Sequence, residues 1–158
     1  MEYKAHFNSL LDYNSWANNN VVLALKKNNI NNRKPIELFS HIVNAEIICF
    51  GRVNKDFNYP FKPFEIRSYD ENINLLKSNN FKWKDFINSL KETDFNNVIE
   101  YKNIKGENCI LRIWEIIIHM LNHSTYHRGQ IASTLRSMDI QPPVSDFAEF
   151  VKFEKSKI

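Results

Sequence analysis

The sequence is poor in the two residues that most often interrupt regular structure, with only 3 Gly and 5 Pro among 158 residues. Its hydrophobic fraction is 43%, which is enough to form a core. Together these values exclude a disordered, collagen-like or linker-rich chain. A chain of this length forms one domain, and we expect that domain to span residues 1–158.

Cysteine and net charge are also scarce. The two cysteines, Cys49 and Cys109, are too few for the disulfide framework of a small secreted domain, and they form no CxxC pair. The net charge of +3 comes from scattered residues, so no basic footprint for nucleic acid or an anionic membrane is present. No secretory leader or membrane-spanning apolar stretch is apparent. We therefore expect a cytoplasmic protein with reduced thiols and no nucleic-acid or membrane partner.

Apolar residues recur at helical intervals in four long stretches. They predict helices from Tyr3 to Lys27, from Pro35 to about Gly51 or Val53, from Tyr69 to about Glu92 and from about Leu111 to Ser137. The first half of the last stretch is apolar nearly all round, as in a helix buried centrally in a bundle. The fold class is therefore all-α, a four-helix up-and-down bundle with at least one longer crossover connection.

Three shorter segments complete the expected organisation. Residues 54–64 contain two prolines and several aromatic residues, and they predict a loop that acts as a lid or wall. Residues 97–112 alternate in places around Lys105–Glu107, which predicts a short β-hairpin or extended excursion near 98–110. After Pro142 and Pro143, a short C-terminal helix is expected from Asp146 to Phe153, capped by Ser145 or Asp146.

Three of the five histidines are spaced four residues apart in the last long helix: His119, His123 and His127. Residues with this spacing project from one face of a helix, with Cβ atoms about 6 Å apart. Two imidazoles so placed can bind one divalent ion, each at about 2.0 to 2.1 Å. The spacing alone leaves open whether the pair is His119 with His123 or His123 with His127.

A third ligand must come from another helix, and His41 is the natural candidate. It is the only histidine of the second predicted helix, on the apolar face beside Leu38 and Ala45. Three neutral nitrogen donors with one open position would resemble the ligand set of catalytic zinc sites. A lone buried histidine, however, is more often a hydrogen-bonded core residue than a metal ligand.

These motifs carry a resemblance to a known family. The run HMLNHSTYHRGQIASTLR at 119–136, followed by the double proline and Asp146, resembles the C-terminal signature of the DinB/YfiT-like superfamily of small metal-binding helical bundles. The segment YNSWANNNVV at 13–22 is similar to the pattern of that family's first helix, and the surroundings of His41, including Glu46 and Arg52, fit its second. The likeness covers nearly the whole chain.

The resemblance implies that the metal ligands are His41, His123 and His127, with His119 packing or hydrogen-bonding nearby. Relatives usually carry a glycine between the last long helix and the double proline, where this chain has residues 137–140. Asp139 is expected to supply the left-handed turn there.

Several further residues are candidates for the pocket or for contacts behind the ligands: Trp16, Glu37, His119, Tyr126, Arg128 and Gln130. Arg128 is expected near the rim of the site, where it holds an anionic substrate group or forms a surface ion pair.

Other side chains have two open interpretations. Glu37 and Glu46 flank His41 as hydrogen-bonding partners or proton acceptors. Trp16, Tyr13 and Tyr126 either line the pocket or belong to the core. Gly129, inside a helix, indicates either the close approach of another helix or chain or a glycine that is tolerated there without a structural role.

The resemblance implies a divalent metal, Zn or Ni, and for some relatives a low-molecular-weight thiol that the metal activates. We expect a metal-dependent enzyme with thiol S-transferase-like or hydrolase-like detoxification chemistry on a small-molecule substrate, and a homodimer as in many relatives. The alternative is a non-catalytic, stress-associated dimeric bundle with a structural metal. Such a metal needs a closed shell of four protein ligands, and no obvious fourth ligand exists unless His119 or a carboxylate joins.

Overall fold

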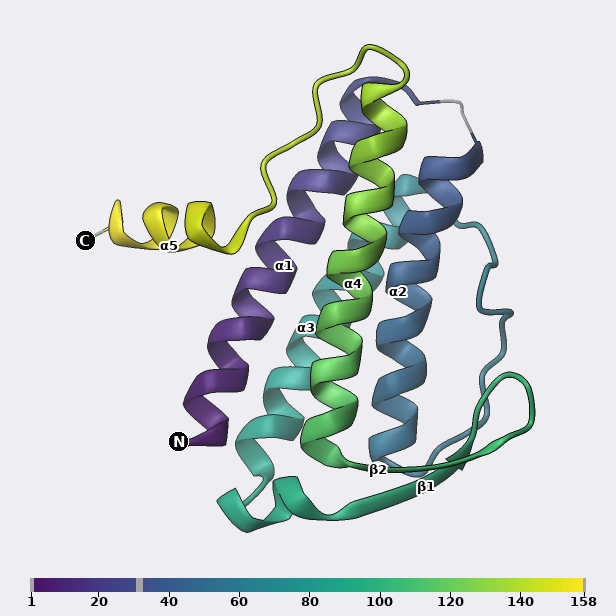
Figure 1. The fold of residues 1–158 in the computed structure, drawn as a ribbon, viewed down its shortest axis with the longest axis vertical. Helices are drawn as coiled ribbons and strands as arrows, with labels where there is room; N and C mark the ends of the chain where they lie inside the picture. The colour runs from purple at the N-terminus through teal and green to yellow at the C-terminus, as the bar shows by residue number, and fades with distance from the viewer. Residues whose placement is uncertain (1, 31–32, 158) are drawn as a thin grey trace.

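The computed structural model describes residues 2–30 and 33–157, and four long helices form its body (Figure 1). They are α1 (Tyr3–Lys27), α2 (Arg33–Val53), α3 (Tyr69–Ser89) and α4 (Ile113–Arg136). Both α1 and α2 pack against α3 and α4. Because α2 and α3 run in the same direction, the segment between them returns along the length of the bundle (Figure 1). The predicted all-α bundle with a longer crossover is confirmed.

The smaller elements lie at one end of the bundle and beside α1 (Figure 1). Strands β1 (Val98–Lys102) and β2 (Asn108–Arg112) form the predicted antiparallel hairpin. The short C-terminal helix is α5 (Phe147–Lys155), and Asp146 precedes it without a side-chain capping bond. A 3-10 helix, η1 (Glu92–Asn96), was not predicted; it follows α3, which ends at Ser89 rather than near Glu92.

Two local features follow from residue chemistry. Asp139 has φ 56, so it adopts the expected left-handed turn in place of a glycine. The start of α3 is fixed by a capping box in which Ser68 and Glu71 bond each other's backbone N–H groups. In the described part of the chain, none of the helices has the length and apolar character needed to span a bilayer.

The core consists of two apolar clusters separated by a buried polar layer. One cluster, towards the hairpin, includes Phe7, Trp83 and Ile117, and the other includes Val22 and Phe39. Every long helix contributes to the layer between them, which contains Asn14, Asn18, Glu46, Asn79 and Arg128, all less than 6% exposed.

Two asparagines of α1 connect the opposite charges of this layer. Asn14 and Asn18 donate through Nδ2 to Oε1 of Glu46 at 2.8 and 3.0 Å. Nη1 of Arg128 donates to Oδ1 of each asparagine at 2.8 Å. Sliding one helix along the others would separate these groups and leave buried polar atoms without partners, which costs free energy of folding. The layer therefore favours one alignment of α1, α2 and α4.

The polar layer predicts a pH-dependent stability. Burial raises the pKa of Glu46 to about 7, against hydrogen bonds from Asn14 and Asn79 and the charge of Arg128. The folded chain therefore keeps a proton that the unfolded chain releases, so the contribution of Glu46 to the free energy of unfolding falls as pH rises from about 5 to 7. The expected loss is about 3 kcal/mol, since one pKa unit corresponds to about 1.4 kcal/mol.

Glu46→Gln should remove this contribution, so the free energy of unfolding of the variant minus that of the wild type should rise by about 3 kcal/mol between about pH 5 and 7, measured with urea at several pH values in metal-free buffer. The matched control is Glu154→Gln, an exposed position on α5 that should follow the wild type. A Glu46→Gln curve parallel to the wild type would contradict the assignment.

The glycines provide a second prediction, because within the described chain no helix approaches Gly129 closely, whereas a close approach that was not predicted occurs at Gly51. A Cβ at Gly51 would meet the Asp56 carbonyl oxygen at 2.4 Å and the Tyr59 ring at 2.7 Å, whereas one at Gly129 meets nothing within 4 Å in the described chain. Gly51→Ala should destabilise by about 1 to 3 kcal/mol through overpacking. Gly129→Ala should stabilise by about 0.5 to 1 kcal/mol through helix propensity. Thermal unfolding measures both, and a destabilised Gly129→Ala would indicate a contact with another chain.

Candidate metal centre

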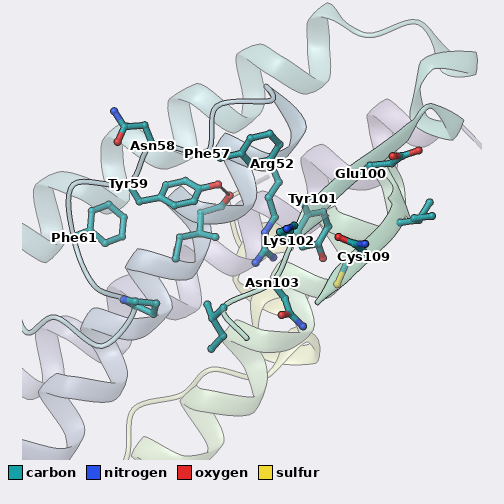
Figure 2. Close-up of a pocket in the computed structure, with 15 residues that line it drawn as sticks. Arg52, Phe57, Asn58, Tyr59, Phe61, Glu100, Tyr101, Lys102, Asn103 and Cys109 are labelled. Carbon is teal, nitrogen blue, oxygen red and sulfur yellow. Dashed lines mark hydrogen bonds between the residues drawn. The ribbon is translucent and has the colours of Figure 1, made fainter. Parts of the chain in front are cut away.

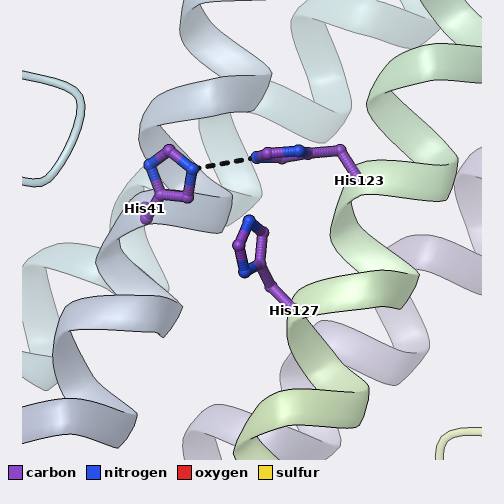
Figure 3. Close-up of side chains that lie close together, drawn as sticks. All are labelled: His41, His123 and His127. Atoms are coloured by element: carbon purple, nitrogen blue, oxygen red, sulfur yellow. Dashed lines mark hydrogen bonds between the residues drawn. The ribbon is translucent and has the colours of Figure 1, made fainter.

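Helices α2 and α4 bring three imidazoles together at one side of the bundle (Figure 3). His41 on α2 and His127 on α4 are each 8% exposed, and His123, one turn before His127, is half-buried. One candidate donor atom from each residue lies within 4.8 Å of the other two, and the Nε2 atoms of His41 and His123 are 3.0 Å apart. Two nitrogens bound to one tetrahedral zinc ion at about 2.0 to 2.1 Å would lie about 3.4 Å apart, a separation within the range found in this cluster. The cluster is therefore compatible with a metal site.

The outward-facing nitrogens of two rings have oxygen partners. Nδ1 of His41 lies 2.8 Å from the Pro63 carbonyl oxygen, and Nδ1 of His127 lies 2.7 Å from Oε1 of Gln130. Because these oxygens only accept hydrogen bonds, we assign the proton of each neutral ring to Nδ1. Nε2 then keeps its lone pair for the centre, an arrangement that metal-binding histidines typically adopt. The residues present therefore fit a divalent ion.

The electrostatic environment favours the neutral form that ligates metals. Burial lowers the pKa of His41, although the Pro63 hydrogen bond and the charge of Glu37 act in the opposite direction. Burial lowers the pKa of His123 to about 4, and the neighbouring charges of His127 and His41 add to this effect. Both rings are consequently neutral near pH 7, the form that ligates a metal. Since the His41 proton is on Nδ1, Nε2 of His123 donates to Nε2 of His41, and a metal bound there would displace that proton to the other nitrogen of His123.

The crossover between α2 and α3 forms a wall of the site, as expected for residues 54–64. The Phe64 ring stacks on His41 with centroids 3.9 Å apart and an interplanar angle of 6°. Asn44, buried one turn after His41, donates to the carbonyl oxygens of Lys62, Pro63 and Glu65 at 3.1 to 3.3 Å. Sequence reasoning missed Pro63 and Phe64 individually, since only the aromatic content of the loop pointed to a wall.

The other candidate residues divide between the site and the core. His119 lies beside the cluster, with its ring 5.7 Å from His123, and Tyr126, which is 64% exposed, has its ring 5.1 Å from His127. Glu37 acts on His41 through its charge.

The remaining expectations are corrected. Arg128 is 2% exposed and belongs to the polar layer rather than to the rim, because the amides of α1 satisfy its guanidinium. Glu46 lies in the same layer and not beside His41. Trp16 packs on Phe150 and Phe153 near α5, and Tyr13 bonds Arg128 and the Ser145 carbonyl. None of these side chains is part of the cluster.

Comparison with known proteins gives one finding. The model of the DinB family matches residues 1–157, which include the three histidines, the crossover and the hairpin. None of the curated proteins matches the chain.

The choice of the histidine pair predicts a difference between two neighbours on α4. His123→Ala should reduce the metal content well below one ion per chain, because it removes one of three donors. His119→Ala, its matched control one turn earlier, should retain the wild-type content. Elemental analysis of protein purified without a nickel column provides the measurement, and the reverse result would reject the pair His123 and His127.

Proposed function

The chain belongs to the DinB family, and on that premise we propose that it is a metal-dependent enzyme that activates a small thiol or water. His41, His123 and His127 hold the ion, with Zn and Ni as the candidates. The observation that carries the proposal is the size of the donor cluster. It contains three histidines and no further His, Cys, Asp or Glu from the described residues. Three protein ligands leave a position for an exchangeable ligand, whereas structural zinc sites use four.

A divalent ion bound there would lower the pKa of a thiol or water in the open position and so supply a nucleophile near neutral pH. The chain's own residues perform the remaining tasks. Pro63 and Gln130 hold two imidazoles in the orientation that directs Nε2 inward. The Phe64 ring covers one face of His41 and limits the access of water to it.

Group transfer from a thiol fits this arrangement. The sulfur attacks an electrophilic carbon of a second substrate, a carbon–sulfur bond forms, and the leaving group departs with its electron pair. The thiol proton passes to solvent or to Glu37, which lies one turn before His41 on α2. The same nucleophile position filled by water would give hydrolysis.

Thiol binding predicts a spectroscopic change in protein loaded with Co²⁺, a coloured stand-in for zinc. Titration with 2-mercaptoethanol should produce a sulfur-to-metal charge-transfer band, because the thiolate occupies the open position. His119→Ala should retain the band, and His123→Ala should lose it together with the metal. A conjugation assay with an alkyl halide should then show release of halide that depends on both metal and thiol.

A structural metal predicts a different result in the same titration. With all four positions filled by protein, the cobalt spectrum would not respond to saturating thiol. His119→Ala would then lower the metal content, because His119 is the histidine nearest to the cluster. This pair of results would replace the enzymatic proposal with the non-catalytic bundle.

A further inference from the structure

A large cavity lies beyond the candidate metal centre, between the second half of α2, the crossover and the hairpin (Figure 2). Its volume is about 950 Å³, within the range of pockets that bind small organic ligands. Ile48 and Arg52 of α2 form its floor together with residues of the crossover and of both strands. The function proposed above gives this cavity no role.

Arg52 brings a positive charge into this cavity. Its guanidinium lies 4.2 Å above the centre of the Tyr101 ring, and its side chain is half-buried. It takes part in none of the ion pairs found among the described residues. Its contacts are to a neutral ring and a neutral thiol, since burial raises the pKa of Cys49 to about 11. Within the described part of the chain, no acidic side chain forms an ion pair with the guanidinium, although Asp56 of the crossover and Glu100 of β1 bring negative charge to the same region.

The charged residues of the hairpin do not change this conclusion. Glu100 and Lys102 also line the cavity, but they alternate with Tyr101 along β1, so their side chains leave the strand on the opposite face from the ring that meets Arg52. Figure 2 shows Glu100 directed away from Arg52. Both residues are exposed to solvent, where their charges are screened.

Aromatic side chains form the walls around the guanidinium. Tyr59 and Phe61 of the crossover lie on one side of Arg52, and Tyr101 lies on the other (Figure 2). The Tyr59 hydroxyl donates to the Ile48 carbonyl oxygen at 3.1 Å, which fixes its ring against α2. Phe57 adds an apolar surface that is 49% exposed. The aromatic walls can pack against an aromatic ring of a ligand, and the guanidinium can bind a carboxylate with two hydrogen bonds.

Pro63 connects the cavity to the metal centre. This residue lines the cavity, and its carbonyl oxygen accepts the hydrogen bond from His41. Along α2, Arg52 lies 11 residues after His41, a rise of about 16 Å.

We propose that this cavity is the binding site for an aromatic carboxylate, with Arg52 holding the carboxylate and the aromatic walls holding the ring. That this acid is the class of substrate brought to the metal rests on the proposed function. The binding site itself requires only the cavity, the guanidinium and the walls.

The test measures binding of 2-naphthoate and of its neutral analogue 2-naphthamide to the metal-loaded full chain by calorimetry. The acid should bind about tenfold or more tightly than the amide, because a charge-assisted bond to a half-buried guanidinium is worth roughly 1.5 to 3 kcal/mol. Arg52→Gln should abolish this preference and leave amide binding unchanged. The matched control, Arg136→Gln, removes an exposed arginine at the far end of α4 and should bind as the wild type does.

A second variant keeps the test decisive if Arg52→Gln fails to fold. Phe57→Ala truncates a partly exposed wall residue outside the core, so it should fold and weaken binding of the acid and the amide alike. Equal affinity for acid and amide in the wild type, or no binding of either, would overturn the proposal. A loss in Arg136→Gln equal to that in Arg52→Gln would also overturn it, since the effect would then be non-specific.

Metal-stripped protein separates this proposal from the proposed function. One outcome is that naphthoate still binds through Arg52 without metal while the cobalt spectrum does not change on addition of thiol. That outcome would support the binding site in the cavity and reject the enzymatic proposal. A cobalt spectrum that changes with thiol, in a protein that does not bind naphthoate, would support the enzymatic proposal and reject the binding site in the cavity.

Discussion

The alignment of α2 against α4 is the constraint on which the candidate centre depends, because α2 supplies one imidazole and α4 supplies two. A shift of α4 by one helical turn, about 5.4 Å, would separate the donor atoms by more than one ion can span. The buried layer opposes such a shift. Glu46 of α2 and Arg128 of α4 are connected through Asn14 and Asn18 of α1, so sliding either helix would leave buried charges without partners. Arg128 directly follows His127 in the chain, which ties the alignment of the core to the position of the ligand.

The crossover links the fold to the chemistry we propose. A parallel α2 and α3 require a connection as long as the bundle, and that connection returns along the bundle (Figure 1). Its residues Pro63 and Phe64 contact His41. Asn44 fixes the connection through three carbonyl oxygens, and one of them, that of Pro63, also orients His41. The same segment then provides Tyr59 and Phe61 to the cavity around Arg52. One loop therefore forms the wall of the metal centre and a wall of the cavity.

Sequence periodicity was sufficient to predict the four long helices, because apolar residues recur at helical intervals over long stretches. Few Gly or Pro residues interrupt these stretches. The histidine spacing identified the α4 face, but the choice of His127 over His119 came from the family resemblance, since both pairs have the same spacing. The partner of His41 is a main-chain carbonyl, which leaves no trace in side-chain identity, so Pro63 and Phe64 were not predicted individually. Arg128 was misplaced because an arginine beside a ligand suggests a binding rim. Its burial depends on amides more than 100 residues away in the chain.

The most direct test of the account is X-ray absorption of the zinc-loaded protein, recorded with and without a small thiol. Without thiol, the account predicts three imidazole nitrogens at about 2.0 to 2.1 Å and one light exogenous ligand. With thiol, a single sulfur at about 2.3 Å should replace that ligand while the three imidazoles remain. A shell that contains four protein ligands and does not change with thiol would contradict the account.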